Sequence, residues 1–128
     1  MNAVEQGELN AVTAKVISCA YRVSNTLGAG FLEKVYENAL AVEMRRSRLA
    51  FVQQPGYFVR YRSEVVGDFI PDLVVCDSAI VEIKAVDALT RVHQAQCMNY
   101  LRVTGLKVAL LLNFGAPRLE TRRFVWGF

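Results

Sequence analysis

The first part of the chain carries two stripes of apolar residues at the spacing of an amphipathic helix. From Leu9 to Leu27 an apolar side chain recurs every three or four positions, and Gly28 is expected to end this first helix. A second helix is predicted to start near Phe31 and to close at the arginines of residues 45–48, where cations suit the negative end of a helix dipole. Its side chains that are expected to face inward are Leu32, Val35, Tyr36, Ala39, Leu40 and Met44.

The pattern changes after Leu49 to short runs of β-branched and aromatic residues, separated by turn-forming residues such as Pro55 and Gly56. This pattern predicts three or four antiparallel strands joined by tight turns. The expected strands are residues 58–62, 65–69, 73–76 and 80–85.

A third helical stripe and two further strands are predicted in the last part of the chain. The helix is expected over residues 89–104 with Gly105 as its stop, and strands are expected over residues 108–113 and 122–126. Since a helix connects residues 80–85 to residues 108–113, these two strands are predicted to lie side by side and parallel, through a right-handed crossover. The inward face of the helix is expected to carry Leu89, Val92, His93, Gln96, Cys97, Tyr100 and Leu101.

This order of elements predicts a single domain over residues 1–128. Two helices, a strand meander, a helix and two strands suit a single mixed β-sheet flanked by helices, an α/β or α+β fold. A length of 128 residues suits one core, and 53% hydrophobic with 21% charged residues argues against a disordered chain or a coiled coil. Residues 80–85 are then a central strand, buried on both faces.

Charge and cysteine content narrow the class of protein only slightly. The net charge of +3 permits nucleic-acid binding without requiring it. The cysteines Cys19, Cys76 and Cys97 lack any C-x-x-C spacing, so neither a disulfide framework nor a zinc knuckle is expected. The first residues lack the features of a secretory signal, and the longest apolar run, near Leu110, is too short to span a bilayer. We therefore expect a cytoplasmic protein with no membrane partner.

Two charged residues, Glu82 and Lys84, interrupt the predicted central strand. Because side chains alternate along a strand, both point to one face, where burying an ion with imperfect compensation costs on the order of several kcal/mol. A tight turn at residues 77–79 is expected to lay Asp72 beside Glu82 on the neighbouring strand. Two carboxylates with a lysine form a hard-oxygen site that suits Mg²⁺. A buried ion-pair network that fixes the sheet register is the alternative.

Two short motifs resemble those of a nuclease superfamily. Pro71-Asp72, followed after a short turn by Glu82-Ile83-Lys84, matches the PD-(D/E)xK signature of the restriction-endonuclease-like nucleases. The segment Gly30-Phe31-Leu32-Glu33-Lys34-Val35-Tyr36 matches the pattern that names the GxxExxY family, a group of small proteins placed in that superfamily. The likeness extends over about residues 9–115 and implies a restriction-endonuclease-like core.

The resemblance also implies a role for each residue of the motifs. Asp72, Glu82 and the backbone carbonyl of Ile83 are expected to bind Mg²⁺ or Mn²⁺, and Glu33 matches the acidic residue that this superfamily often adds to the metal site. Lys84 is expected to orient the attacking water and to offset the charge that develops at the scissile phosphate.

The third predicted helix and the second acid of the second helix supply further candidates. Gln96 and Tyr100 resemble the QxxxY element that follows the catalytic strand in RecB-like nucleases, which makes Gln96 a candidate catalytic residue and Tyr100 a candidate substrate-binding residue. His93, the only histidine, is another candidate for contact with substrate, although a lone histidine more often caps or packs. Glu37 lies one turn after Glu33 and is interpreted as an exposed helix charge.

Two classes of function follow from these observations. The resemblance implies a metal-dependent nuclease that hydrolyses phosphodiester bonds of DNA, in preference to RNA. The alternative is a catalytically inactive nuclease-fold module that binds nucleic acid or a protein partner. Because 128 residues leave little for a dedicated DNA-recognition subdomain, the protein is expected to act with a partner or as a homodimer. A metal site for a small phosphorylated metabolite is a third alternative.

Overall fold

The computed structural model describes residues 1–127. Within this range the predicted elements are confirmed to within a few residues, except that α1 begins earlier, behind an Asn2 cap that accepts a hydrogen bond from Glu5 N–H (2.8 Å). The elements are α1 (Ala3–Leu27), α2 (Glu33–Arg46), β1 (Phe51–Gln53), β2 (Tyr57–Tyr61), β3 (Glu64–Phe69), β4 (Leu73–Val75), β5 (Ala79–Lys84), α3 (Arg91–Thr104), β6 (Val108–Asn113) and β7 (Glu120–Val125).

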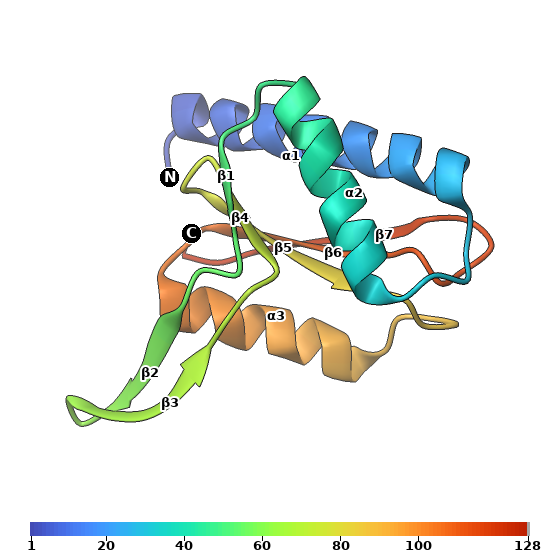
Figure 1. The fold of residues 1–128 in the computed structure, drawn as a ribbon. Coiled ribbons are helices and arrows are strands. Elements are labelled where there is room, and N and C mark those ends of the chain that lie inside the picture. Colours follow the sequence, from blue (N-terminus) through green and yellow to red (C-terminus); the bar gives the residue numbers. More distant parts are fainter. Residues whose placement is uncertain (128) are drawn as a thin grey trace.

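A mixed five-stranded sheet in the order β1-β4-β5-β6-β7 forms the body of the protein. β5 and β6 are parallel and are connected through α3, which confirms the predicted crossover, while the other neighbours are antiparallel. The helices α1 and α2 cover one face of the sheet and α3 covers the other (Figure 1). This is the expected α+β architecture with a restriction-endonuclease-like core, and β5 is its central strand, buried from Ala79 to Ile83.

The hairpin of β2 and β3 forms a separate two-stranded sheet that projects from the body (Figure 1). The prediction of one continuous strand meander is therefore wrong, because β4 pairs instead with β1, a three-residue edge strand that the sequence pattern did not reveal. A period of two residues shows that a segment is extended but does not show which sheet it joins. At the base of the hairpin, Phe69 stacks between Tyr57 and Tyr100, and this aromatic stack anchors it to α3.

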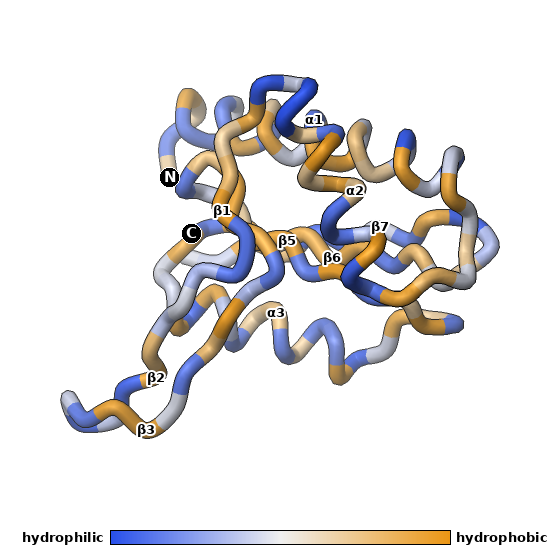
Figure 2. The backbone as a smooth tube through the Cα atoms, in the orientation of Figure 1, coloured by the Kyte–Doolittle hydropathy of each residue, from blue (hydrophilic) through white to orange (hydrophobic). Residues whose placement is uncertain are grey.

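The apolar core lies on both sides of the inner strands β4, β5 and β6, whose backbone is largely coloured as hydrophobic (Figure 2). Val81 and Ile83 point toward α1 and α2, while Ile80 points toward α3. No helix among residues 1–127 is long and apolar enough to cross a membrane.

Four side chains that were expected to face inward are exposed, which corrects the predicted helix faces. Leu32, the N-cap of α2, lines an open cleft, and Val35 lies in the first turn of the same helix. Val92 and Gln96 lie on the first turns of α3, before its buried contacts at Cys97 begin. A helical period identifies the side of a helix that packs, but not how far along the helix the packing continues.

The chain that leaves β5 is held by the end of β6. Asn113 is fully buried, and its side chain accepts hydrogen bonds from Val86 N–H (3.0 Å) and Gly115 N–H (3.0 Å) and donates to the Val86 carbonyl (2.9 Å) and to Glu120 Oε1 (2.8 Å). A Cβ atom at Gly115 would collide with the backbone of Ala85 and Val86. This close packing fixes the backbone directly after Lys84.

We expect Gly115→Ala to lower the free energy of unfolding by roughly 1–3 kcal/mol, because the added methyl group forces two backbone segments apart. Gly7→Ala is the matched control: it lies within α1 with no atom within 4 Å of the added Cβ, and should raise stability by about 0.5–1 kcal/mol. Urea denaturation of both variants measures the difference. A Gly115→Ala variant as stable as wild type would contradict the close contact.

Candidate metal and active site

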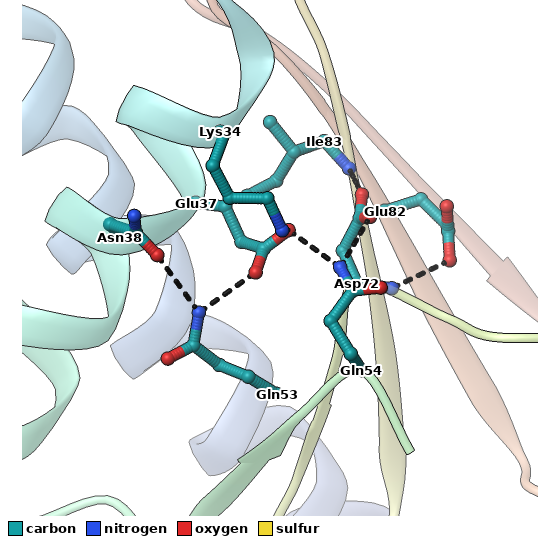
Figure 3. A network of polar contacts seen from close by, with 8 residues as sticks. All are labelled: Lys34, Glu37, Asn38, Gln53, Gln54, Asp72, Glu82 and Ile83. Atoms are coloured by element: carbon teal, nitrogen blue, oxygen red, sulfur yellow. Dashed lines mark hydrogen bonds and ion pairs between the residues drawn. The ribbon is translucent and has the colours of Figure 1, made fainter. Parts of the chain in front are cut away.

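Asp72 and Glu82 lie next to each other where β4 begins and β5 nears its end. β4 and β5 pair antiparallel with Leu73 opposite Val81, so the residue before Leu73 lies beside Glu82. Asp72 N–H donates a hydrogen bond to Glu82 Oε1 (3.2 Å), and Ile83 N–H donates one to Asp72 Oδ2 (2.7 Å) (Figure 3). Each carboxylate is therefore held by the main chain of the strand that carries the other.

These two carboxyl groups are poorly compensated by positive charge. Glu82 is only 8% exposed; burial, followed by the charge of Asp72, raises its pKa to about 8. Burial also raises the pKa of Asp72, and the hydrogen bond from Ile83 N–H opposes that effect. Removing ionised groups from water and placing them side by side both favour their neutral forms. The site therefore favours a cation that can approach one carboxylate oxygen of Asp72 and one of Glu82.

Lys84 points to the same face of β5 as Glu82, because the two residues are two positions apart in a strand. Its positive charge lowers the pKa of Asp72 and of Glu82, but less than burial raises them. Among residues 1–127 no ion pair within 4.0 Å joins the Lys84 ammonium to an acid. The buried ion-pair network considered as an alternative is thus not the arrangement found, and Lys84 remains half-buried beside the carboxylates.

A third acid, Glu37 of α2, is linked to Asp72 through Gln54. Glu37 is only 3% exposed, so its interpretation as an exposed helix charge is wrong. Its carboxylate accepts hydrogen bonds from Lys34 Nζ (3.0 Å), Gln53 Nε2 (2.8 Å) and Gln54 Nε2 (2.8 Å). Gln54 Nε2 also lies 3.4 Å from Asp72 Oδ1, which completes a polar network from α2 through the end of β1 to the two acids (Figure 3).

The burial of Glu37 has a signal in the sequence, whereas the roles of the two glutamines have none. Leu40 and Ala41 follow Glu37 by three and four positions and are buried, so all three share one side of α2. Gln53 and Gln54 lie at the end of β1, whose existence the pattern did not indicate. Their partners lie on other elements, which local periodicity cannot identify.

Glu33 lies at the start of α2, on the rim of an open cleft of about 530 Å³. Glu33 is exposed. The pKa values of Asp72 and Glu82 are raised mainly by the burial of these two groups, and the charge of Glu33 raises them further by a smaller amount. The structure therefore brings Asp72, Glu82 and Ile83 together and leaves Glu33 at the cleft entrance. The cleft is lined by Phe31, Leu32, Glu33, Lys34, Glu37, Asp72, Ile83 and Ala85.

The turn that presents Glu33 is closed by Tyr36. The Tyr36 hydroxyl donates a hydrogen bond to the Gly28 carbonyl (2.6 Å) and accepts one from Phe31 N–H (3.1 Å), while its ring stacks on Phe114 with centroids 4.8 Å apart. Within the same motif Gly30 has φ +115°, a backbone conformation that favours glycine. The glycine and the tyrosine of the motif thus shape the turn, and the glutamate lies on the cleft side.

The α3 candidates lie at different distances from the acids. Gln96 is exposed, and the ring of Tyr100 stacks on Phe69 with centroids 3.6 Å apart. Tyr100 packs on the α3 face of the sheet, to which Glu82 also points because it lies two residues after Ile80. Burial, followed by the charge of Glu82, raises the pKa of Tyr100. His93 Nδ1 accepts a hydrogen bond from Thr90 N–H (3.1 Å) in the capping box that begins α3. His93 therefore caps a helix, and the substrate contacts of these residues stay predictions.

Two carboxylates and one carbonyl are the donors that this site offers to a cation. In a strand the carbonyl of Ile83 points to the same edge as its N–H, which is the edge toward Asp72. The described residues contain no group of three or more His, Cys, Asp or Glu side chains that could hold a metal. Burial raises the pKa of the Cys97 thiol to about 12, so the thiol is protonated in the metal-free protein. Mg²⁺ is usually bound through one or two carboxylates and keeps several waters, so these oxygen donors fit it.

Comparison with known proteins agrees with this geometry. A family model described as the PD-(D/E)XK nuclease superfamily matches residues 10–124. Because the match covers most of the chain, the protein belongs to the PD-(D/E)XK nuclease superfamily, and its domain is nuclease-like. No curated protein and no solved structure matches the chain significantly.

In metal-free protein we expect the carboxyl of Glu82 to make the free energy of unfolding fall as the pH rises from about 4.5 to about 8. The pKa of a glutamate in an unfolded chain is about 4.5, whereas the pKa of Glu82 in the fold is about 8. Between these pH values the folded state therefore binds more protons than the unfolded state. Glu82→Gln removes this titration. Its stability relative to wild type should therefore increase across the window, by on the order of a few kcal/mol at pH 8.

Urea denaturation in EDTA at several pH values between 4.5 and 8 measures this difference. Glu64→Gln, at an exposed position of β3, is the control, and its profile should follow that of wild type. A constant difference between Glu82→Gln and wild type over this window would show that Glu82 is not held as an uncompensated buried acid.

Proposed function

We propose that the protein is a Mg²⁺- or Mn²⁺-dependent nuclease that hydrolyses phosphodiester bonds of DNA, in preference to RNA. The observation that carries the proposal is the pair of adjacent carboxylates, Asp72 and Glu82. Lys84 lies on the same strand as Glu82, and its ammonium forms no ion pair among residues 1–127. Nucleases of this superfamily generally use divalent metal ions. The motif of Gly30, Glu33 and Tyr36 supports placement within the GxxExxY group.

The residues of the site divide into those that hold the metal and those that act on water and phosphate. Asp72, Glu82 and the Ile83 carbonyl would hold the ion, with Glu33 approaching from the cleft rim. When bound, Mg²⁺ supplies Lewis acidity toward the phosphoryl oxygen and lowers the pKa of water. Lys84 orients the attacking water and offsets the negative charge that develops on the phosphate. A fixed ammonium in a half-buried position does this with little reorganisation.

The residues of α3 and the weak positive charge of the chain support a nucleic-acid substrate. Tyr100 packs on the sheet face to which Glu82 points, and Gln96 lies four residues before it, so the α3 side of the site can contact substrate, with His93 at the start of the same helix. The net charge of +3 favours association with a polyanion.

We expect wild-type protein to bind Mn²⁺ in calorimetry and to cleave DNA with Mg²⁺ or Mn²⁺. Asp72→Ala and Glu82→Ala should abolish metal binding, because each removes a carboxylate ligand. Lys84→Ala should still bind Mn²⁺ but should cleave roughly 10²–10³-fold more slowly, the usual effect of removing one group that stabilises transition-state charge.

The control for metal binding is Glu8→Ala at an exposed position of α1, which should bind and cleave as wild type does. The nuclease proposal fails if wild type cuts neither DNA nor RNA with millimolar metal, or if the Asp72 and Lys84 variants cut as well as wild type.

A second candidate function, a nuclease-fold module that acts as a homodimer, is favoured by the projecting hairpin. Phe58, Tyr61, Val65 and Val66 each expose more than half of their surface there. A two-stranded sheet is marginally stable alone, and exposed apolar side chains on such a projecting element suit a protein interface. We propose that a second copy of the chain covers this hairpin.

We expect sedimentation of wild-type protein to show a dimer that Phe58→Ser with Val66→Ser converts to a monomer, since both substitutions remove exposed apolar surface. Val4→Ser with Val42→Ser, at exposed apolar positions of α1 and α2, is the control and should leave the mass unchanged. A wild-type monomer at all concentrations contradicts the dimer without affecting the metal site.

A further inference from the structure

We propose that Gln54 is a positioning residue that orients the carboxylate of Asp72 toward the cation, and that Glu37 fixes the amide of Gln54 for this purpose. The inference rests on the metal-dependent function proposed above and adds to it two residues outside the PD-(D/E)xK signature. Neither residue ligates the metal in this arrangement. Both act through Asp72.

Gln54 contacts Asp72 through both its main chain and its side chain. Gln54 N–H donates a hydrogen bond to the Asp72 carbonyl (2.9 Å), and Gln54 Nε2 donates to Asp72 Oδ1 (3.4 Å). The other carboxylate oxygen, Oδ2, accepts the short hydrogen bond from Ile83 N–H (2.7 Å). With one donor at each oxygen, rotation of the carboxylate is restricted.

The two oxygens of Asp72 are not held equally. The contact to Oδ2 is short, whereas the contact to Oδ1 is long and therefore weak. Each carboxylate oxygen has two lone-pair positions, so Oδ1 keeps the capacity to accept a cation while Gln54 holds its direction. This division of roles suits a ligand that must be preoriented without being saturated.

Glu37 determines which end of the Gln54 amide faces Asp72. A carboxylate only accepts hydrogen bonds, so Gln54 presents its NH₂ group to Glu37 Oε1 (2.8 Å). The second hydrogen of the same NH₂ group then serves Asp72. Glu37 is itself fixed by Lys34 Nζ (3.0 Å) and by Gln53 Nε2 (2.8 Å), and it is buried, so its orientation is well defined.

The backbone at Gln54 supports a role for its side chain. Gln54 has φ +54°, in the left-handed region, which is unfavourable for a residue with a Cβ and readily accessible to glycine. At Gln54 this conformation is held by hydrogen bonds of its main chain and its side chain to Asp72 and of its amide to Glu37. A glutamine at a position that suits glycine is explained by the two carboxylates that its amide joins.

Gln53 offers a matched control within the same network. Its Nε2 also donates to Glu37, at Oε2 (2.8 Å), and to Asn38 Oδ1 (3.1 Å), but no hydrogen bond of the described residues joins it to Asp72. A variant of Gln53 therefore removes one hydrogen bond to Glu37 but leaves those of Lys34 and Gln54 at Glu37 Oε1, and it does not touch the Asp72 carboxylate.

The test compares Gln54→Gly with Gln53→Ala in the full-length protein, using three measurements. Calorimetry measures the Kd for Mn²⁺, amide hydrogen exchange in EDTA measures the opening of the Ile83 N–H bond to Asp72, and thermal unfolding in EDTA measures stability. Gln54→Gly should weaken Mn²⁺ binding roughly tenfold, the usual loss when a residue that orients a ligand is removed. Its Ile83 amide should exchange faster, while its Tm stays equal to that of wild type or rises, since glycine suits φ +54°.

Gln53→Ala should leave both the Mn²⁺ affinity and the exchange of Ile83 unchanged. The proposal is overturned if Gln54→Gly leaves the exchange of Ile83 unchanged, or if Gln53→Ala has the same effects as Gln54→Gly. If wild type binds no Mn²⁺ but Ile83 still exchanges faster in Gln54→Gly, Gln54 holds Asp72 and the metal-dependent function is the part that fails. If wild type binds Mn²⁺ and Gln54→Gly binds it equally well, the function stands and the positioning role fails.

Discussion

Two acidic side chains placed side by side, where β4 begins and the central strand β5 nears its end, are the constraint on which the rest of this structure depends. Glu82 is buried and Asp72 is partly buried, and neither has an ion-pair partner in the described residues, so the free energy of this arrangement is unfavourable unless hydrogen bonds or a cation compensate it. The main-chain N–H groups of Asp72 and Ile83 provide part of that compensation. A shift of the β4–β5 register by one residue would turn Glu82 to the opposite face of the sheet and remove this compensation.

The surrounding elements can be understood by how they hold this pair. The parallel neighbour β6 ends in Asn113, whose buried amide and the adjacent Gly115 fix the chain after Lys84. On the opposite side, β1 is only three residues long and buries little, but its end brings Gln54 against Asp72. This short edge strand thus places a polar contact at the site as well as packing Phe51 against the core.

The hairpin of β2 and β3 is stabilised differently from the body of the protein. The body buries both faces of its sheet between helices, whereas the hairpin has one aromatic stack at its base and exposes the apolar side chains toward its tip. The stack of Phe69 on Tyr100 also joins the hairpin to α3.

The sequence by itself determined the helices, the central strand, its parallel crossover and the acids that meet in the candidate site. These features depend on local periodicity and on a tight turn of a few residues between β4 and β5, which the chain encodes directly. Only the tertiary structure decided that the hairpin leaves the sheet, that Val35 and Gln96 are exposed, and that Glu37 is buried. It also decided that Gln54 joins Glu37 to Asp72, across 17 and 18 residues of sequence. The physical reason is that burial and hydrogen-bond partners at such separations depend on which segments pack together in space, and a residue's local pattern carries no record of that choice.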